Sequence, residues 1–197
     1  GSENCADLYW ATRFYVPDPI IFLEHKGKKI LIASDLEVSR AKKEADVDVV
    51  LSMSGIEQKL RKAGRKISPG VVLDSVLRQR RIKHLQVPAY FPIQQAVMLK
   101  KRGYTLEVVH DPFYPGREIK SLDEKKHITA ALRATEAGIQ AGIDVLKKSK
   151  IKNGKIYRNG SLLTSEALRQ VIEMKMMECG ALGQHTIVAC GKQAADP

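Results

Sequence analysis

Residues 20–44 read IIFLEHKGKKILIASDLEVSRAKKE, and this stretch decides the class of fold. Two apolar runs rich in β-branched residues flank a short polar turn at His25–Lys28, a pattern that predicts a β-hairpin. Ser34 and Asp35 then supply the side-chain oxygens that cap a helix N-terminus, so we expect a helix through about Glu44. A hairpin followed at once by a helix predicts a domain that mixes strands and helices.

The alternation of strands and helices continues to residue 109. Short apolar runs predict strands at Asp48–Ser52, Leu85–Val87 and Thr105–Val109. Helical patterns lie between them: about Gly55 to Gly64, a helix started by Ser68-Pro69 with Val71, Val72, Val76 and Leu77 on one face, and Ile93 to Lys101. We therefore predict an α/β domain with a mixed sheet and flanking helices over residues 1–116.

The segment His110–Arg117, HDPFYPGR, changes the character of the chain. Two prolines and a glycine in eight residues neither continue a helix nor fit a central strand. We interpret this segment as the linker to a second region, residues 117–197.

The second region predicts an incomplete domain. A long helix over Leu122–Lys148 carries one apolar stripe, made of Ile128, Leu132, Ile139, Ile143 and Leu146. Lys155–Leu163 predicts a hairpin with an Asn-Gly turn, Thr164 begins a helix to about Cys179, and His185–Cys190 predicts a buried strand. Two helices and one strand bury too little apolar surface to stand alone.

The chain has 197 residues and a formal net charge of +11, with 44% hydrophobic and 6% aromatic residues. The apolar fraction is ordinary for a globular protein. No run approaches the roughly 18–20 apolar residues of a membrane span, no secretory signal is evident, and Gly1-Ser2 is typical of a cloning tag. Cys5, Cys179 and Cys190 have no short spacing, so we expect reduced thiols in a cytoplasmic protein, without a disulfide framework or zinc site.

Positive charge is concentrated between Lys59 and Lys83, where Asp74 is the single carboxylate. The cations are Lys59, Arg61, Lys62, Arg65, Lys66, Arg78, Arg80, Arg81 and Lys83. One interpretation is a surface that follows the phosphates of a nucleic acid. We favour two helices with solvated basic faces, because no aromatic residue interrupts the run to stack on bases. A third interpretation is an acidic region outside this chain that balances the charge.

The common motifs of catalysis are absent from the sequence, including GxGxxG, GxxxxGK[ST], HExxH, GxSxG and zinc-type cysteine pairs. His110-Asp111 could form an oriented base, but beside a proline-rich turn we interpret the pair as a turn cap. Cys190 ends an apolar strand, so we interpret it as a buried structural thiol rather than a nucleophile. We interpret the methionines of the predicted helix after Thr164 as side chains that pack against the rest of the domain: Met174, Met176 and Met177.

The order of the segments nonetheless resembles a known family. Residues 7–14, DLYWATRF, resemble the "NxYYLTGF" opening of the creatinase-type N-terminal domain, with Ala11 and Arg13 in place of the usual Leu and Gly. Residues 18–41 resemble the hairpin and "SDLExxRA" helix of the same domain. That domain precedes the catalytic domain of aminopeptidase P, prolidase and creatinase.

The later part of the chain resembles the start of that catalytic domain. Residues 117–121, REIKS, resemble the "RxIKSxxE" junction into the long first helix of the pita-bread fold. Residues 186–197, TIVACGKQAADP, are similar to a strand and loop of Xaa-Pro metallopeptidases and form the most specific part of the resemblance. The resemblance implies a creatinase-like N-terminal domain followed by an incomplete pita-bread α+β domain.

The resemblance also implies a chemistry for the longer parent protein. Two divalent metal ions, manganese or cobalt, would hold a hydroxide that attacks the peptide bond before proline. The family's substrate-binding histidine would follow Pro197, and the metal ligands, two Asp, one His and two Glu, would follow that histidine. Asp196 precedes the missing histidine and is not a ligand by motif. We therefore assign no catalytic, substrate-binding or metal-binding residue and no cofactor to this chain.

The chain as it stands is accordingly expected to be an inactive fragment of a metallo-exopeptidase whose partners are proline-containing peptides. It is expected to serve oligomerisation or substrate access, as a homodimer, with no membrane partner. Two alternatives stay open: a non-catalytic pita-bread protein that binds a partner without metal, and a basic nucleic-acid-binding module. The sequence does not distinguish aminopeptidase from dipeptidase action.

Overall fold

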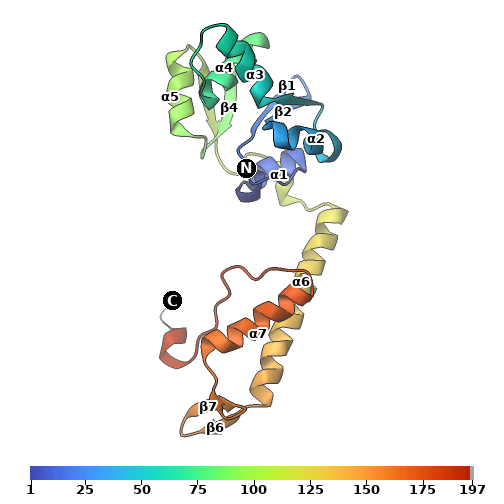
Figure 1. Ribbon diagram of the computed structural model, residues 1–197, viewed down its shortest axis with the longest axis vertical. Helices are drawn as coiled ribbons and strands as arrows, with labels where there is room; N and C mark the ends of the chain where they lie inside the picture. The colour runs from blue at the N-terminus through green and yellow to red at the C-terminus, as the bar shows by residue number, and fades with distance from the viewer. Residues whose placement is uncertain (196–197) are drawn as a thin grey trace. The chain divides into compact units, whose positions relative to one another are not determined.

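The computed structural model describes residues 1–195, which form two compact units. The first unit ends at Ile119 and the second begins at Lys120, whereas the sequence analysis placed the division after residue 116. Figure 1 shows the strands and short helices of the first unit and the two longer helices of the second. Within residues 1–195, no helix combines the length and apolar character that crossing a bilayer requires.

The first unit opens with a 3₁₀ turn, η1 (Ser2–Asn4), and helix α1 (Ala6–Thr12), which the sequence analysis did not assign. Ser2 is buried, and its hydroxyl donates to the carbonyl of Phe14 and accepts the amide N–H of Val16 at 3.0 Å. Of the Gly1-Ser2 pair, interpreted from sequence as a tag remnant, Ser2 is therefore packed into this unit, whereas Gly1 is exposed.

The predicted hairpin and mixed sheet are confirmed. Strands β1 (Ile21–His25) and β2 (Lys28–Ala33) pair antiparallel across a turn in which Gly27 has φ +70°, a left-handed conformation suited to glycine. Helix α2 (Asp35–Glu44) then returns the chain so that β3 (Val49–Ser52) runs parallel to β2.

The remaining predicted elements of the first unit also form. They are α3 (Met53–Lys62), α4 (Pro69–Gln79), β4 (His84–Pro88), α5 (Ile93–Lys101) and β5 (Thr105–Val109). Strands β4 and β5 pair parallel with each other as a separate two-stranded sheet, so the unit holds two sheets rather than one.

Helix α4 joins the cores of the first unit. Val72 and Val76 are buried against Ile32 of the mixed sheet, whereas Leu73 and Leu77 are buried with Leu99 of α5. The helix is buried on two sides because its apolar residues occupy more than one stripe, and Ser68 caps its first turn by accepting the amide N–H of Val71.

The second unit consists of α6 (Leu122–Lys147), α7 (Ser165–Glu178) and a small antiparallel sheet between them. Its strands are β6 (Lys150–Lys152), β7 (Lys155–Arg158) and β8 (Ser161–Leu162). Both turns of this sheet are Asn-Gly pairs, Asn153-Gly154 and Asn159-Gly160, with positive φ at all four residues. The sequence analysis predicted only the second turn, so the expected hairpin is in fact a three-stranded meander.

Helix α7 runs along α6 (Figure 1) and packs on small residues. A Cβ atom at Gly138 would lie 2.7 Å from Cγ of Met176, and one at Gly142 would lie 3.0 Å from Cδ1 of Ile172. The large apolar stripe predicted on α6 lies on another side of the helix, and its side chains are 39–58% exposed: Ile128, Leu132, Ile139, Ile143 and Leu146. Small residues let α7 approach α6 closely on their own face of the helix. Because α7 lies on that face, it does not cover the apolar stripe.

The predicted strand at His185–Cys190 is wrong for the described part of the chain. Residues 181–190 form no helix or strand, and a 3₁₀ turn, η3 (Gly191–Ala194), follows them. A strand requires a neighbour to receive its hydrogen bonds, and β6–β8 do not pair with this segment. Ile187 is consequently 86% exposed.

Candidate functional site

The residues singled out from sequence lie apart from one another. His110 and Asp111 are both exposed, and no hydrogen bond joins their side chains in the described structure, so they do not form an oriented base. Cys190 is exposed, which makes the predicted buried thiol wrong, because the strand expected to bury it does not form. Of the methionine group, Met176 packs against α6, whereas Met174 and Met177 are more than half exposed.

A dinuclear metal centre does not fit the described residues. Within residues 1–195, no three His, Cys, Asp or Glu side chains come together in a way that could hold a metal ion. Two adjacent divalent ions need several carboxylate oxygens. Residues 186–195 of the motif are described, while Asp196 and Pro197 lie outside the described residues.

Asp74 of α4 is the centre of a buried ionic cluster. Its carboxylate is 0% exposed and accepts hydrogen bonds from Arg78 at 3.0 Å, from Arg65 at 3.1 Å and from Arg102. The hydroxyl of Tyr104 donates to the same carboxylate at 2.9 Å. This cluster, named the Asp74 cluster, joins the residues that follow or end α3, α4 and α5.

The electrostatics of the Asp74 cluster favour the ionised carboxylate. Burial alone would raise the pKa of Asp74, but hydrogen bonds from Arg78, Tyr104 and Arg65 and the charge of Arg102 outweigh burial and leave the pKa below its usual value. Burial and the hydrogen bond to Asp74 together raise the pKa of Tyr104. Asp74 is therefore ionised at neutral pH, and every hydrogen bond that its carboxylate accepts is charge-assisted.

The cluster explains part of the basic run. Arg65 and Arg78 bind Asp74, and Arg61 pairs with Glu57 one turn earlier at 3.3 Å. Other cations of the run occupy the last turns of α3 and α4 or lie beyond them, where positive charge is favourable next to the exposed carbonyl groups. Seven of the nine cations of the run are exposed, as the solvated-face interpretation requires: Lys59, Arg61, Lys62, Lys66, Arg78, Arg81 and Lys83.

A second buried carboxylate, Asp7 of α1, joins three distant segments. Asp7 is 4% exposed and accepts hydrogen bonds from the hydroxyl of Tyr90 and from the guanidinium of Arg117, each at 2.5 Å. Burial and then the hydrogen bond to Asp7 raise the pKa of Tyr90 above its usual value. The hydrogen bond to Asp7 is the main reason why the pKa of Arg117 is raised.

Aromatic contacts join two of the same segments, α1 and the residues around Tyr114. The rings of Trp10 and Tyr114 lie 5.2 Å apart at 33°, and Arg13 lies over the Trp10 ring at 5.7 Å. Burial, with the charges of Glu24 and Asp7, raises the pKa of Tyr114 to about 12. Sequence reasoning missed both carboxylate clusters. The pair Asp74 and Arg78, one helical turn apart, carried a local signal that could have been found. The other donors to the two carboxylates, apart from Arg65, come from segments far away along the chain.

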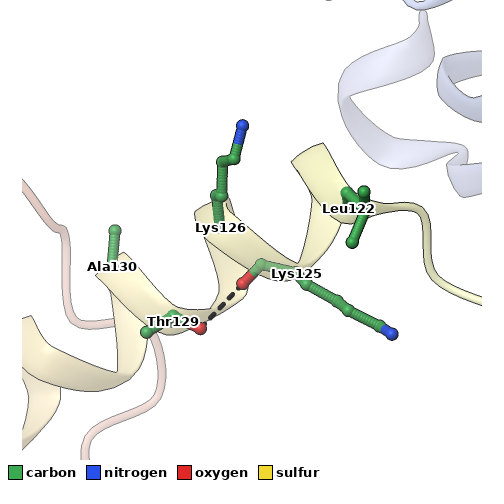
Figure 2. Close-up of a pocket in the computed structure, with 5 residues that line it drawn as sticks. All are labelled: Leu122, Lys125, Lys126, Thr129 and Ala130. Carbon is green, nitrogen blue, oxygen red and sulfur yellow. Dashed lines mark hydrogen bonds between the residues drawn. The ribbon is translucent and has the colours of Figure 1, made fainter.

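The described surface also contains a depression of about 590 Å³ on the first turns of α6. Figure 2 shows its lining, Leu122, Lys125, Lys126, Thr129 and Ala130, with the two lysine side chains extending in different directions. The hydroxyl of Thr129 donates to the backbone carbonyl of Lys125 at 2.8 Å, so it is already used. One helix lines the whole depression, and it assembles no catalytic group.

Comparison with known proteins identifies the fold. No family model matches the sequence, and no curated protein matches it. An X-Pro aminopeptidase from Thermotoga maritima matches 90% of this chain with a TM-score of 0.62 at 15% identity. Prolidase from Pyrococcus furiosus matches 89% with a TM-score of 0.63 at 13% identity, and the Xaa-Pro dipeptidase from Bacillus anthracis matches 89% with a TM-score of 0.60 at 14% identity.

These similarities show that the chain has the fold of the N-terminal part of pita-bread peptidases. The matches cover 44%, 44% and 42% of the three solved chains, so this chain spans less than half the length of each. The fold class inferred from the sequence, an α/β N-terminal domain followed by the start of a pita-bread domain, is confirmed.

Proposed function

We propose that this chain is the N-terminal portion of a metal-dependent Xaa-Pro peptidase, which hydrolyses the peptide bond before proline. The observation that carries the proposal is the agreement in fold over about nine tenths of the chain with both an X-Pro aminopeptidase and a prolidase. The similarity of residues 186–197 to the strand and loop that precede the family's substrate-binding histidine supports it from the sequence side.

The described residues take no chemical step in this proposal. Residues 1–195 gather no metal-ligand set. In this proposal the two divalent ions and their ligands belong to a longer parent protein. The 197-residue chain supplies the N-terminal α/β unit and the first two helices of the metal-binding domain. We propose that the chain alone is inactive and that it serves oligomerisation or substrate access in a cytoplasmic homodimer.

The test compares two lengths of the same protein. The coding region beyond Pro197 is read and expressed, and both proteins receive Mn²⁺ with Gly-Pro and with an Xaa-Pro-Xaa tripeptide. The longer protein should release an amino acid that a chelated control does not release, and the two substrates distinguish dipeptidase from aminopeptidase action. A downstream sequence without the His and the Asp, Asp, His, Glu, Glu series would contradict the peptidase and favour the non-catalytic pita-bread protein.

A nucleic-acid-binding module is the second candidate, and the exposed cations of the basic run favour it. We favour the peptidase over the nucleic-acid-binding module for two reasons. Arg65 and Arg78 are bound by Asp74, and cations at helix C-termini need no external partner. Fluorescence anisotropy with labelled single-stranded and duplex DNA at 50 and 200 mM salt measures whether the chain binds nucleic acid and so tests this second candidate. Binding that weakens steeply with salt would support the module.

A further inference from the structure

The segment His110–Ile119 was expected to be a linker, but its contacts are those of a bound element. It contains a 3₁₀ turn, η2 (Pro115–Glu118), and the amide N–H of Arg117 donates to the carbonyl of Tyr114 at 3.0 Å. The segment belongs to the first compact unit through Ile119. The residues that hold it come from α1 at the other end of this unit.

Three kinds of contact attach the segment to α1. Arg117 forms a 2.5 Å ion pair with Asp7, whose side chain is only 5% exposed. The ring of Tyr114 packs on Trp10. The backbone at Gly116 passes so close to the indole of Trp10 that a Cβ atom there would lie 3.0 Å from Cζ2, so a larger residue at this position would require the ring to shift.

We infer that His110–Ile119, named the strap, is a segment that binds α1 and can detach from it while the rest of the first unit stays folded. The Asp7–Arg117 ion pair is the contact that chiefly holds the strap in place. Asp7 also accepts the hydroxyl of Tyr90, from the loop after β4, so one buried carboxylate holds three segments that are separated by 83 and 110 residues. Without this carboxylate, Arg117 and Tyr90 lose their shared acceptor in a partly buried place. The contacts of Tyr114 and Gly116 with Trp10 remain, and we expect the strap to open more often than the sheets of the same unit.

Trp10 is the only tryptophan of the chain, and it reports directly on the strap. In the full 197-residue protein, Asp7→Asn and Arg117→Ala should roughly double the acrylamide quenching constant of Trp10. They should also speed amide exchange across residues 113–119 by about tenfold or more, the loss expected for a charge-assisted hydrogen bond. Exchange in β2 and α4 should stay slow. Arg117→Lys keeps the charge and should recover part of the protection.

Asp46→Asn is the matched control, because Asp46 is an exposed carboxylate in an ion pair with Lys29 and should change neither readout. The strap is overturned if both variants leave the quenching of Trp10 and the exchange of residues 113–119 unchanged. It is equally overturned if exchange rises to the same degree in β2 and α4, since Asp7 would then stabilise the unit as a whole. Should Asp7→Asn not fold, Arg117→Ala and Tyr90→Phe each remove a single donor to Asp7 and allow the same comparison.

Discussion

Tyr104 donates its hydroxyl hydrogen to the carboxylate of Asp74 at 2.9 Å, and both side chains are buried. Tyr104 immediately precedes β5, whereas Asp74 lies in the middle of α4. Arg102, the residue that follows α5, binds the same carboxylate. The Asp74 cluster therefore fixes α4 against the second half of the first unit by polar contacts as well as by the packing of Leu73 and Leu77.

Asp74→Ala should destabilise the first unit more than any exposed acidic substitution. The change leaves Tyr104 and the three arginines without their acceptor, and the expected loss is about 2–3 kcal/mol, below the usual cost for a fully buried pair because the arginines reach solvent. Urea unfolding followed by circular dichroism measures it. Glu57→Ala, which removes the partner of the exposed Arg61, is the control and should cost less than about 0.5 kcal/mol.

The same cluster predicts a dependence of stability on pH. The pKa of Asp74 is lower in the folded chain than in the unfolded chain, so its contribution is present above about pH 4 and is lost as the pH falls through the folded value. The difference in unfolding free energy between the wild type and Asp74→Asn should therefore shrink from pH 6 to pH 3. Asp35, whose pKa Ser52 and Ser54 lower, is present in both proteins and cancels. A difference that stays constant over this range would contradict the prediction.

Local chemistry made most of the first unit predictable. Helix α5 and strand β5 begin and end at the predicted residues, and α2 ends at the predicted Glu44. These boundaries depend on neighbouring residues: caps, prolines, glycines and the period of the apolar pattern. The Asn153-Gly154 turn carried the same local signal as Asn159-Gly160 and could also have been found.

Features that depend on distant residues were not predictable in the same way. The strand at His185–Cys190 has a strand-like composition but no neighbouring strand among the described residues, so composition alone gave the wrong answer. Asp74 was noticed as an isolated carboxylate in a basic run, yet nothing local indicates Arg102, 28 residues away, as its partner. Asp7 and Arg117 are further apart still, and only the fold brings them together.

Gly55 within helix α3 and Gly64 just after it should respond oppositely to alanine. Gly64 follows the helix with φ +70° and has no atom near its Cβ position, so the cost of Gly64→Ala is purely that of the left-handed backbone, about 1 kcal/mol. Gly55 lies inside the helix, and a Cβ atom there would lie 3.4 Å from the nearest atom, Oγ of Ser52, which is ordinary contact. Gly55→Ala should therefore be neutral or stabilise by about 0.5–1 kcal/mol. Thermal unfolding of both variants measures the contrast, and a loss of stability in both would contradict it.

The glycines of α6 that face α7 offer a similar contrast within the second unit. A Cβ at Gly138 would lie 3.0 Å from the backbone carbonyl oxygen of Ile172, which the helix holds in place, so Gly138→Ala should destabilise by about 1–3 kcal/mol. At Gly142 the close atoms are the end of the Ile172 side chain, which can rotate away. Gly142→Ala should be nearly neutral, because the gain in helix propensity offsets the shift. Equal losses of α7 protection in hydrogen exchange would contradict this account.

The surface area of the chain is larger than that of compact domains of the same mass. The solvent-accessible surface is 13973 Å², against roughly 11,000 Å² for two separate globular domains that share this mass. The uncovered stripe of α6 contributes to the excess, with Leu132 58% and Ile139 51% exposed. Contiguous exposed apolar surface of this kind favours association.

The 197-residue chain should therefore self-associate through the α6 stripe. Sedimentation velocity should show a mass that rises with concentration toward a dimer, and Leu132→Gln combined with Ile139→Gln should shift the protein toward monomer by about tenfold or more in dissociation constant, because two large apolar contacts are lost. Arg133→Gln changes an exposed neighbour on the same helix and should leave the association unchanged. A monomer at the highest concentration reached, or an equal effect of Arg133→Gln, would show that the stripe is not the surface that associates.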